Sequence, residues 1–401
     1  MPTTEGQVGF GIVGCGRIGR WHAKTVRGLL GAELIAVSDV DELAREKAAR
    51  RFGAVACCSA ELLRSPEVDV VSVCTPPATH ADLAVAAASA GKHVLVEKPL
   101  APSLAEADRV ITACEGHGVH LGVVHQQRAR SASRAARTLI GEGALGALLT
   151  GSAVHTWRRR PEQLETWRGA AAAGGGLLLD QAIHAIDLLI WFLGEPLWAT
   201  GATAALTGRT ESEDSAVAAI GFADGALATL TGTMAANVVR DDIAIDVAGT
   251  RGAFRLEVRD YDHAEIVALQ LADSGALSAR RLSHQEIEEL VRLQGGRWRE
   301  GPSAVLWRWL ATLAGKNRGG APFRSPRAFL RRVADRVAQS ETGELQGHAA
   351  VLQSMASAAR GTGGPLVTGV EARRALAVIE AVARSNREGG RRVMLSSLTA
   401  L

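Results

Sequence analysis

The chain has 401 residues, enough for two domains, and 47% of them are hydrophobic, which is ample for a buried core. The formal net charge is +3 and no basic block is interleaved with aromatic residues, which argues against nucleic acid as a partner. No run reaches the roughly 18 consecutive apolar residues of a membrane helix, and the start MPTTEGQ lacks an export signal, so we expect a cytoplasmic protein without a membrane partner.

A buried strand is predicted at residues 8–13, where an apolar run is bounded by glycine. It leads directly into GCGRIG, residues 14–19, a G-x-G-x-x-G sequence that opens a helical pattern. In this motif the first glycine makes a tight turn, the second lets a pyrophosphate approach, and the third packs the helix on the strand. The phosphates then lie at the positive N-terminus of the helix. The residues expected to contact a dinucleotide here are Gly14, Gly16, Arg17, Ile18 and Gly19.

A second predicted strand, AELIAVSDV, carries Asp39 at its carboxyl end. Asp39 follows Gly19 at the spacing of roughly 20 residues at which an acid hydrogen-bonds the adenosine ribose. A carboxylate there also repels a 2′-phosphate, so we expect NAD to be preferred over NADP. The ordinary alternative for Asp39 is a turn former at a strand end, and the nearby Arg45 complicates the preference.

Strands and helices alternate as far as residue 125, which predicts a parallel, doubly wound sheet. Ligands of such a sheet gather outside the carboxyl ends of its strands. The segments TPPATH (75–80) and EKPL (97–100) fall at two of these ends, and the residues expected at the dinucleotide there are Thr75, Pro76, His80, Glu97 and Lys98. All five cysteines lie in this part of the chain without the spacing of metal ligands, so we expect reduced thiols and no metal.

The segment GGGLLLDQAIHAIDLLIWFLG, residues 174–194, predicts a buried helix that polar residues interrupt. On a helix of 3.6 residues per turn, Asp180, His184 and Asp187 fall on one narrow face. Apolar residues spread around most of the circumference, so this polar face is expected to be covered as well. A satisfied network of buried hydrogen bonds is the ordinary explanation of such a row. The dinucleotide motifs upstream favour a site of proton transfer instead.

Taken together, G-x-G-x-x-G, TPPATH, EKP and GGG…DQAIHAIDLL resemble the glucose–fructose oxidoreductase/inositol dehydrogenase/rhizopine-catabolism (Gfo/Idh/MocA) family of NAD(P)-dependent oxidoreductases. The resemblance covers about residues 7–260 and 346–393. It implies an α/β protein, with a Rossmann domain at residues 1–125 and, at 126–401, an α/β domain built on a large, mostly antiparallel open sheet. A closing helix is expected at residues 365–393. Enzymes of the family oxidise a ring hydroxyl of a sugar or cyclitol, or reduce the ketone.

The resemblance also implies roles for individual residues, with Lys98 and His184 as the functional pair. His184 would take the proton of the substrate hydroxyl, because imidazole titrates near neutral pH. Lys98 would stabilise the developing alkoxide. Asp180 would hold either the imidazole or a neighbouring hydroxyl. Asp187 would orient His184 from the other side or cap a neighbouring element.

Substrate contacts are expected in the second half of the chain, in HQQRA (125–129) and HTWRRRPEQLETWRG (155–169). Tryptophan offers a flat apolar surface to a sugar, and arginine offers donors to hydroxyl groups or phosphate. Surface or interdomain packing is the ordinary alternative for each of these residues. The expected contacts are Gln127, Trp157, Arg158, Trp167 and Arg168, together with Asp180 and His184, and Gln126 and Arg128 are alternatives to Gln127.

Short alternating runs separated by glycine and Asp-Gly signals predict the hairpin strands of the second sheet. One face of this sheet must cover the segment of His184, and in the family a second subunit covers the other face, so we expect a homodimer or homotetramer. Residues 281–345 depart from the family pattern and are expected to add amphipathic helices that form a lid, an interface arm or a decoration.

Three functions compete at this point. The leading hypothesis is a dehydrogenase or ketoreductase acting on a sugar, nucleotide sugar or (amino)cyclitol. A second is an NAD-dependent glycosidase, which oxidises a ring hydroxyl only transiently and shows no net NADH. A third is a regulator that binds dinucleotide and sugar without chemistry, although a lysine and a histidine directed at one hydroxyl argue against it.

Overall fold

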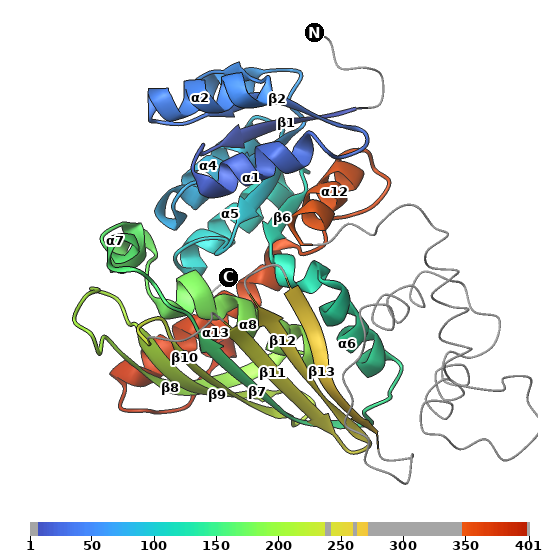
Figure 1. The fold of residues 1–401 in the computed structure, drawn as a ribbon, viewed down its shortest axis with the longest axis vertical. Helices are drawn as coiled ribbons and strands as arrows, with labels where there is room; N and C mark the ends of the chain where they lie inside the picture. The colour runs from blue at the N-terminus through green and yellow to red at the C-terminus, as the bar shows by residue number, and fades with distance from the viewer. Residues whose placement is uncertain (1–6, 237–241, 260–262, 272–346, 399–401) are drawn as a thin grey trace, which may run out of the picture.

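Two β-sheets organise the part of the chain that the computed structural model describes, residues 7–236, 242–259, 263–271 and 347–398. The parallel sheet of six strands lies in the upper part of Figure 1, and the mostly antiparallel sheet of eight strands lies in the lower part. This arrangement confirms the predicted fold class, a Rossmann sheet followed by a large, mostly antiparallel sheet. The segment 281–345 lies outside the described residues, so its expected helices stay a prediction.

The first sheet has the strand order β3-β2-β1-β4-β5-β6, and every pair in it is parallel. This is the order of a Rossmann fold, whose ligand crevice lies at the carboxyl ends of the strands where the order reverses, between β1 and β4. Its strands are β1 (Val8–Val13), β2 (Ala32–Ser38), β3 (Val55–Ala56), β4 (Val70–Val73), β5 (His93–Glu97) and β6 (Leu121–Val124). Its helices are α1 (Arg17–Val26), α2 (Glu42–Phe52), α3 (Ser59–Arg64), α4 (His80–Ser89) and α5 (Leu104–Gly116).

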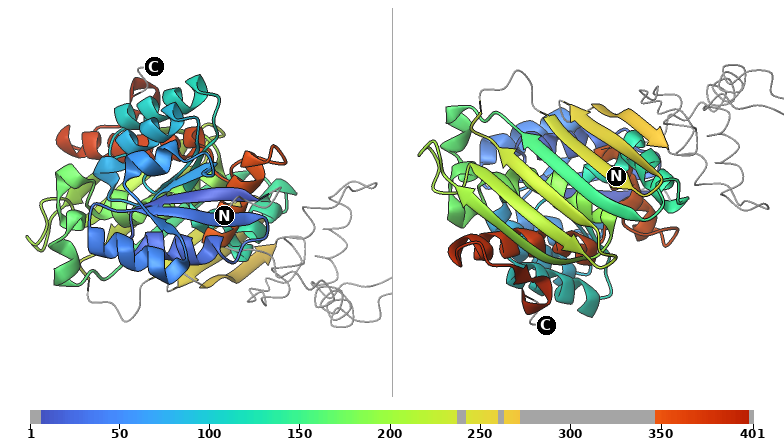
Figure 2. Two further views of the ribbon diagram at one scale, coloured as in Figure 1. Left: turned by 90° about the horizontal axis from the view of Figure 1, so that it is seen from above. Right: turned by 90° about the horizontal axis from the view of Figure 1, so that it is seen from below.

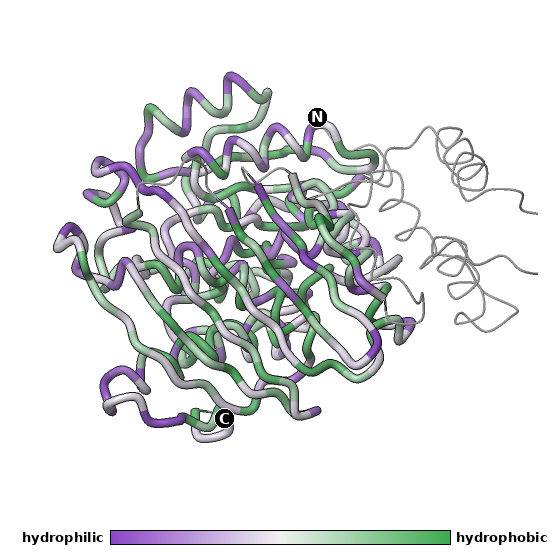
Figure 3. The backbone as a smooth tube through the Cα atoms, turned by 60° about the horizontal axis from the view of Figure 1, so that its bottom comes forward, coloured by the Kyte–Doolittle hydropathy of each residue, from purple (hydrophilic) through white to green (hydrophobic). Residues whose placement is uncertain are grey.

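The central strands of this sheet are apolar along their whole length because helices cover both faces. Every residue of β1 is buried, and Val70, Val71 and Val73 of β4 have no exposed surface. Figure 3 shows the same pattern, with hydrophobic stretches along strands and hydrophilic residues gathered at loops and on the outer turns of helices. The apolar run at residues 8–13 therefore forms a buried strand, as its sequence predicts.

The second sheet has the order β13-β12-β11-β7-β10-β9-β8-β14, and within it only β7 and β10 run parallel. Helices cover one face, whereas the view from below in Figure 2 shows no described helix in front of the other. Along β10, Ala228 and Leu230 are buried while Thr229 and Thr231 are exposed, as one covered face requires. The strands are β7 (Leu148–Thr156), β8 (Pro196–Ala204), β9 (Ser215–Phe222), β10 (Leu227–Thr233), β11 (Asp242–Gly249), β12 (Gly252–Arg259), β13 (His263–Leu271) and β14 (Val393–Met394).

The helices of the second half pack on the covered face or return to the first sheet. They are α6 (Ser131–Gly141), α7 (Pro161–Leu164), α8 (Ile183–Leu193), α12 (His348–Ala359) and α13 (Gly369–Arg387). α13 lies within the range expected for a closing helix and packs against β8, α8 and α5. α12 instead shares a hydrophobic cluster with strands of the Rossmann sheet, through side chains such as Leu352 and Met355. The C-terminal part of the chain therefore contributes to both sheets.

The segment Ala171–Leu193 is apolar and helical enough to span a membrane by length and composition, but 89% of its most apolar window is buried inside the protein. The buried core helix of a globular protein has the same length and composition. The segment does not form the regular helix that its sequence predicts. Residues Leu178–Ala182 form a π-helical turn, and the α-helix begins at Ile183. The wider turn holds more than 3.6 residues, so the spacing between Asp180 and His184 departs from that of a regular α-helix.

Candidate active site

A cavity of about 1050 Å³ lies between the carboxyl ends of the Rossmann strands and the segment that carries Asp180 and His184. The expected contact residues that line it are Gly14, Gly16, Arg17, Ile18, Asp39, Thr75, Pro76, Glu97, Lys98, Trp167, Arg168, Asp180 and His184. Within the described part of the chain, Gly19, His80, Gln127, Trp157 and Arg158 do not line it. The cavity thus joins the glycine turn to the lysine and histidine expected to handle the substrate.

The glycine turn between β1 and α1 has the geometry that a dinucleotide needs. Gly14 has φ of +101°, and a Cβ on it would meet the carbonyl oxygen of Cys74 at 2.7 Å. A Cβ on Gly16 would meet nothing within 4 Å, which leaves open space where a pyrophosphate approaches. A Cβ on Gly19 would lie 1.7 Å from the carbonyl oxygen of Gly14, so this residue serves the packing of α1 on the turn. The residues present fit the phosphates of a dinucleotide.

Asp39 stands at the carboxyl end of β2 and lines the same cavity. Its Oδ2 accepts a hydrogen bond from the backbone N–H of Cys15 at 2.6 Å, and its Oδ1 accepts one from Asp41 at 2.9 Å. The carboxylate therefore braces the glycine turn, and each oxygen retains a lone pair for a ribose hydroxyl. Arg45 donates to the backbone oxygen of Asp39 at 3.3 Å and also lines the cavity.

The segment TPPATH contributes two residues to the cavity lining and one buried histidine that connects backbone segments. Thr75 and Pro76 line the cavity, whereas the buried imidazole of His80 connects two backbone segments behind it. Its Nδ1 lies 2.8 Å from the carbonyl oxygen of Pro99, and its Nε2 lies 2.8 Å from that of Thr75. His80 therefore fixes the TPPATH turn against the EKPL loop and does not itself face the cavity.

Lys98 follows directly after β5 and reaches across to the second half of the chain. Its Nζ donates a hydrogen bond to the backbone oxygen of Asp180 and lies 3.7 Å from the carboxylate Oδ1 of the same residue. Burial lowers the pKa of Lys98 below its usual value, although the neighbouring carboxylates of Asp180 and Glu97 oppose this change. The ammonium group is thus held in the cavity wall by one residue through two different oxygen atoms.

Asp180 is the centre of a cluster of cations. Its Oδ2 lies 2.5 Å from Nη2 of Arg159 and 3.7 Å from Nε of Arg168. Burial raises the pKa of Asp180, but the charges of Lys98, Arg159 and Arg168 outweigh burial and lower that pKa to about 2. The carboxylate is therefore ionised at any physiological pH, and it engages arginine and lysine side chains.

Sequence reasoning missed Arg159 and chose its neighbour Arg158. The extended backbone of β7 continues past Thr156, because the N–H groups of Trp157 and Arg159 donate to the carbonyl oxygens of Thr233 and Met234. Alternate side chains therefore face opposite sides. Trp157 and Arg159 are buried, whereas Arg158 is exposed. The period of two in HTWRRR is the signal that would have identified Arg159.

His184 is 1% exposed and lines the cavity from the first turn of α8. Burial lowers its pKa well below the usual 6.5, and the charge of Lys98 acts in the same direction. The imidazole is therefore neutral at physiological pH, which is the state of a proton acceptor. Its surroundings favour the uncharged form, as they do for His155, whose pKa burial and Lys98 lower to about 3.

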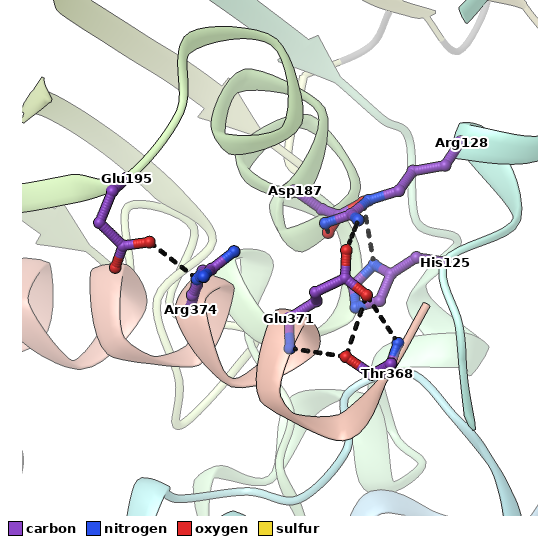
Figure 4. A network of polar contacts seen from close by, with 7 residues as sticks. All are labelled: His125, Arg128, Asp187, Glu195, Thr368, Glu371 and Arg374. Atoms are coloured by element: carbon purple, nitrogen blue, oxygen red, sulfur yellow. Dashed lines mark hydrogen bonds and ion pairs between the residues drawn. The ribbon is translucent and has the colours of Figure 1, made fainter. Parts of the chain in front are cut away.

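Asp187 belongs to a different network, which Figure 4 shows together with its neighbours. Arg128 binds its carboxylate with two groups, Nε to Oδ2 at 2.9 Å and Nη2 to Oδ1 at 2.7 Å. The third nitrogen of Arg128 donates to Glu371 of α13 at 3.0 Å, and Nδ1 of His125 lies 3.5 Å from Asp187. Arg128, considered above as a substrate contact, is thus committed to this network, which links α8, α13 and the turn after β6.

Only some of the residues expected to contact the substrate line the cavity. Trp167 and Arg168 line the cavity, with the guanidinium carbon of Arg168 4.4 Å from the ring centre of Trp167. Gln127 is 1% exposed and does not line the cavity, whereas its neighbour Gln126 does. A short 3₁₀ turn, Gln126–Ala129, follows β6 and ends the alternation of side chains that a strand would impose. The spacing alone could therefore not decide which of the two glutamines faces the cavity.

Two family descriptions match the chain. "Oxidoreductase family, NAD-binding Rossmann fold" matches residues 8–125, and "GFO/IDH/MocA C-terminal domain" matches residues 133–255. The first match contains all the strands of the Rossmann sheet, and the second runs from α6 into β12 of the second sheet.

Named relatives cover similar stretches. Levoglucosan dehydrogenase of Pseudarthrobacter phenanthrenivorans is 30% identical over 289 residues, which span 62% of this chain and 74% of the relative. Myo-inositol 2-dehydrogenase of Thermotoga maritima is 30% identical over 255 residues, which span 61% of this chain and 73% of the relative.

Solved structures extend the likeness to nearly the whole chain. The WlbA dehydrogenase of Bordetella pertussis, in complex with NADH and UDP-GlcNAcA, is 25% identical and has a TM-score of 0.75, with 98% of this chain and 99% of that chain covered. A levoglucosan dehydrogenase in complex with NADH and levoglucosan has a TM-score of 0.73 at 20% identity, with 97% and 99% covered, which is a likeness of fold.

Proposed function

The chain belongs to the Gfo/Idh/MocA family of oxidoreductases, and from this premise we propose that it transfers a hydride between NAD and a ring carbon of a sugar, nucleotide sugar or (amino)cyclitol. The observation that carries the proposal is the cavity that runs from Gly16 and Asp39 to Lys98 and His184. One end offers the open glycine turn that a pyrophosphate needs, and the other offers a neutral imidazole beside an ammonium group. Relatives named for levoglucosan and inositol support a polyol substrate.

When bound, the nicotinamide supplies the hydride acceptor or donor. His184 accepts the proton of the substrate hydroxyl during oxidation and returns it during reduction, because its neutral form is available at physiological pH. Lys98 donates a hydrogen bond to the same oxygen and favours the negative charge that develops there. Both side chains line the cavity and are shielded from bulk water. Electrostatic interactions are stronger in such a site than in water, because the local dielectric constant is lower.

Asp180 acts in this scheme as a positioning residue. Its backbone oxygen and its carboxylate both hold the ammonium group of Lys98, while Arg159 anchors the carboxylate from the other side. The role that the sequence suggests, in which Asp180 holds the imidazole of His184 or a neighbouring hydroxyl, stays a prediction.

NAD is proposed as the preferred cofactor because Asp39 lines the cavity at the carboxyl end of β2, where its carboxylate would repel a 2′-phosphate. Arg45, which lines the same part of the cavity, works in the opposite direction. Exchange of Asp39 for serine should therefore improve the use of NADP relative to NAD, as measured by the ratio of the two kcat/KM values.

The substrate is tested with purified protein, NAD or NADP, and a panel of inositols, anhydrosugars, free hexoses, glycosides and nucleotide sugars. Reduced-nicotinamide absorbance that rises with one compound class identifies that class, provided that the His184→Ala variant gives no rise. Cleavage of a glycoside without net NADH would point to the transient-oxidation mechanism instead. Dinucleotide binding without turnover of any compound, in either direction, would leave only the regulator.

We also propose that a second copy of the chain covers the open face of the second sheet. Val154, Val217 and Leu227 lie on three neighbouring strands and are 45%, 50% and 52% exposed. An apolar face of this kind costs free energy in water and is typical of an oligomer interface. Light scattering coupled to gel filtration should give the mass of a dimer or tetramer, and Val217→Glu with Leu227→Glu should shift it toward the monomer.

A further inference from the structure

Three side chains from separate elements meet at the wall of the cavity. They are His22 of α1, Glu97 at the end of β5, and His348 at the start of α12. Nε2 of His22 lies 3.0 Å from Oε1 of Glu97, and Nε2 of His348 lies 3.7 Å from the same oxygen. One ligand-type atom from each residue falls within 4.8 Å of the other two.

Two imidazoles and one carboxylate make a donor set that Zn²⁺ uses in proteins. Bonds of about 2.0–2.2 Å in a tetrahedral site place neighbouring donor atoms roughly 3.3–3.5 Å apart. The two contacts to Glu97, at 3.0 and 3.7 Å, lie on either side of that spacing. Small rotations of His348, which is the most accessible of the three side chains, would complete the geometry.

Two of the three side chains have hydrogen bonds of the kind that orient metal ligands. A ligating histidine usually has its other ring nitrogen hydrogen-bonded, and Nδ1 of His22 lies 2.8 Å from Oγ of Ser72. A ligating carboxylate is held in the same way, and Oε2 of Glu97 accepts a hydrogen bond from the backbone N–H of Lys98 at 3.2 Å. Two of the three ligands are thus already oriented by a second layer of hydrogen bonds.

Access is also provided. His22 has no exposed surface, but Glu97 and His348 both line the cavity, which gives an ion a path from solvent. From this convergence we propose that His22, Glu97 and His348 form a binding site for a divalent transition-metal ion of the zinc class. The alternative is that His22 and Glu97 form a buried ion pair that takes no metal.

The test is a calorimetric titration of metal-free, full-length protein with Zn²⁺, repeated with Co²⁺, whose visible absorption reports its ligands. The background carries His93→Ala, because the stacked pair of His93 and His120, with ring centres 5.0 Å apart, could collect metal at the surface. We expect one ion per chain. His348→Ala should weaken binding by about 100-fold or more, since loss of even a supporting residue costs 10–100-fold.

The matched control is His117→Ala, which removes an exposed histidine outside the cluster and should leave binding unchanged. If His348→Ala does not fold, Glu97→Gln replaces it, because this change keeps the shape of the side chain and removes its charge. Zn²⁺ should raise the Tm of the His93→Ala background protein and not that of the variant made in it. Absence of a one-per-chain site in the background protein, or equal binding by folded His348→Ala, would overturn the proposal.

Discussion

At the scale of single residues, the buried row Asp180, His184 and Asp187 is divided between two neighbourhoods. Asp180 joins Lys98 and Arg159 at the cavity, and Asp187 joins Arg128 in the interior. Of these three residues, His184 is the one that brings a neutral imidazole to the cavity at physiological pH. A polar row on a helix therefore need not act as one unit, because each side chain is governed by what packs against it.

The first prediction concerns the pH dependence of oxidation. Burial depresses the pKa of His184 well below 6.5, so the neutral imidazole needed to accept a proton persists as the pH falls through that value. The kcat/KM for oxidation should therefore show no loss centred near pH 6.5, and its acid limb should lie lower. The measurement is a pH profile of kcat/KM for the free enzyme. An acid limb centred at pH 6.5 would contradict this environment for His184.

The second prediction compares two adjacent arginines. Arg159→Ala removes a buried partner 2.5 Å from the carboxylate of Asp180 and should cost about 3 kcal/mol of unfolding free energy. Arg158→Ala removes an exposed side chain and should change this free energy by less than about 0.5 kcal/mol. Urea denaturation of both variants measures the difference. Equal losses of unfolding free energy in the two variants would contradict the assignment of Arg159, and not Arg158, to the cluster around Asp180.

The limits of sequence reasoning at this scale follow from which contacts are local. Lys98 and His184 could be identified because each stands in a short motif whose surroundings are set by neighbouring residues. Arg159 pairs with Asp180, 21 positions away, and Arg128 pairs with Glu371, 243 positions away. No spacing rule reports such pairs, so the sequence could not show that Arg128, one alternative for a substrate contact, pairs with Asp187 and Glu371.

At the scale of elements, the glycine turn behaved as its sequence predicts and the helix of His184 did not. Gly14 needs its positive φ and Gly19 its missing Cβ, and both needs follow from sterics within one motif. The π-helical turn at Leu178–Ala182 follows instead from tertiary contacts, since the backbone N–H of Leu178 donates to Oε1 of Glu213 and Lys98 binds the carbonyl of Asp180. Periodicity assumes a regular helix and cannot reveal it.

The third prediction tests the glycine turn as a phosphate site. A Cβ on Gly16 would meet no atom of the protein within 4 Å, so Gly16→Ala should fold with nearly wild-type stability. It should nevertheless weaken NADH binding about tenfold or more, because the methyl group occupies the space of the pyrophosphate. Fluorescence titration with NADH and thermal unfolding separate the two effects. Gly19→Ala is the contrasting variant, and it should lose stability because its Cβ would lie 1.7 Å from Gly14.

The fourth prediction concerns the network that joins α8, α13 and the turn after β6 (Figure 4). Asp187→Ala leaves the buried guanidinium of Arg128 without its two-point partner and should cost about 3–5 kcal/mol of unfolding free energy. Glu195→Ala removes the partner of Arg374 at 2.9 Å, but this pair is half-exposed and should contribute at most about 1 kcal/mol. Chemical denaturation measures the loss of unfolding free energy in both variants. Equal losses would contradict the prediction that the buried pair contributes more than the half-exposed one.

At the scale of the whole molecule, the family, the Rossmann sheet and the large antiparallel sheet could be predicted from the sequence, and all three are confirmed. Strand periodicity and the order of motifs carry that information. The return of α12 to the first sheet could not be predicted, because it depends on side chains such as Leu352 and Met355 meeting strands more than 200 positions away. That return also brings His348 to Glu97.

In our proposal one cavity holds the dinucleotide at the glycine turn and the proton-transfer residue His184 at its other end. A paired assay of the His184→Ala variant, for NADH affinity and for kcat with the substrate identified from the panel, tests this arrangement. We expect NADH binding within a few-fold of the wild type and kcat lower by about 10²–10⁴-fold. Retained turnover, or loss of NADH binding equal to the loss of turnover, would contradict it.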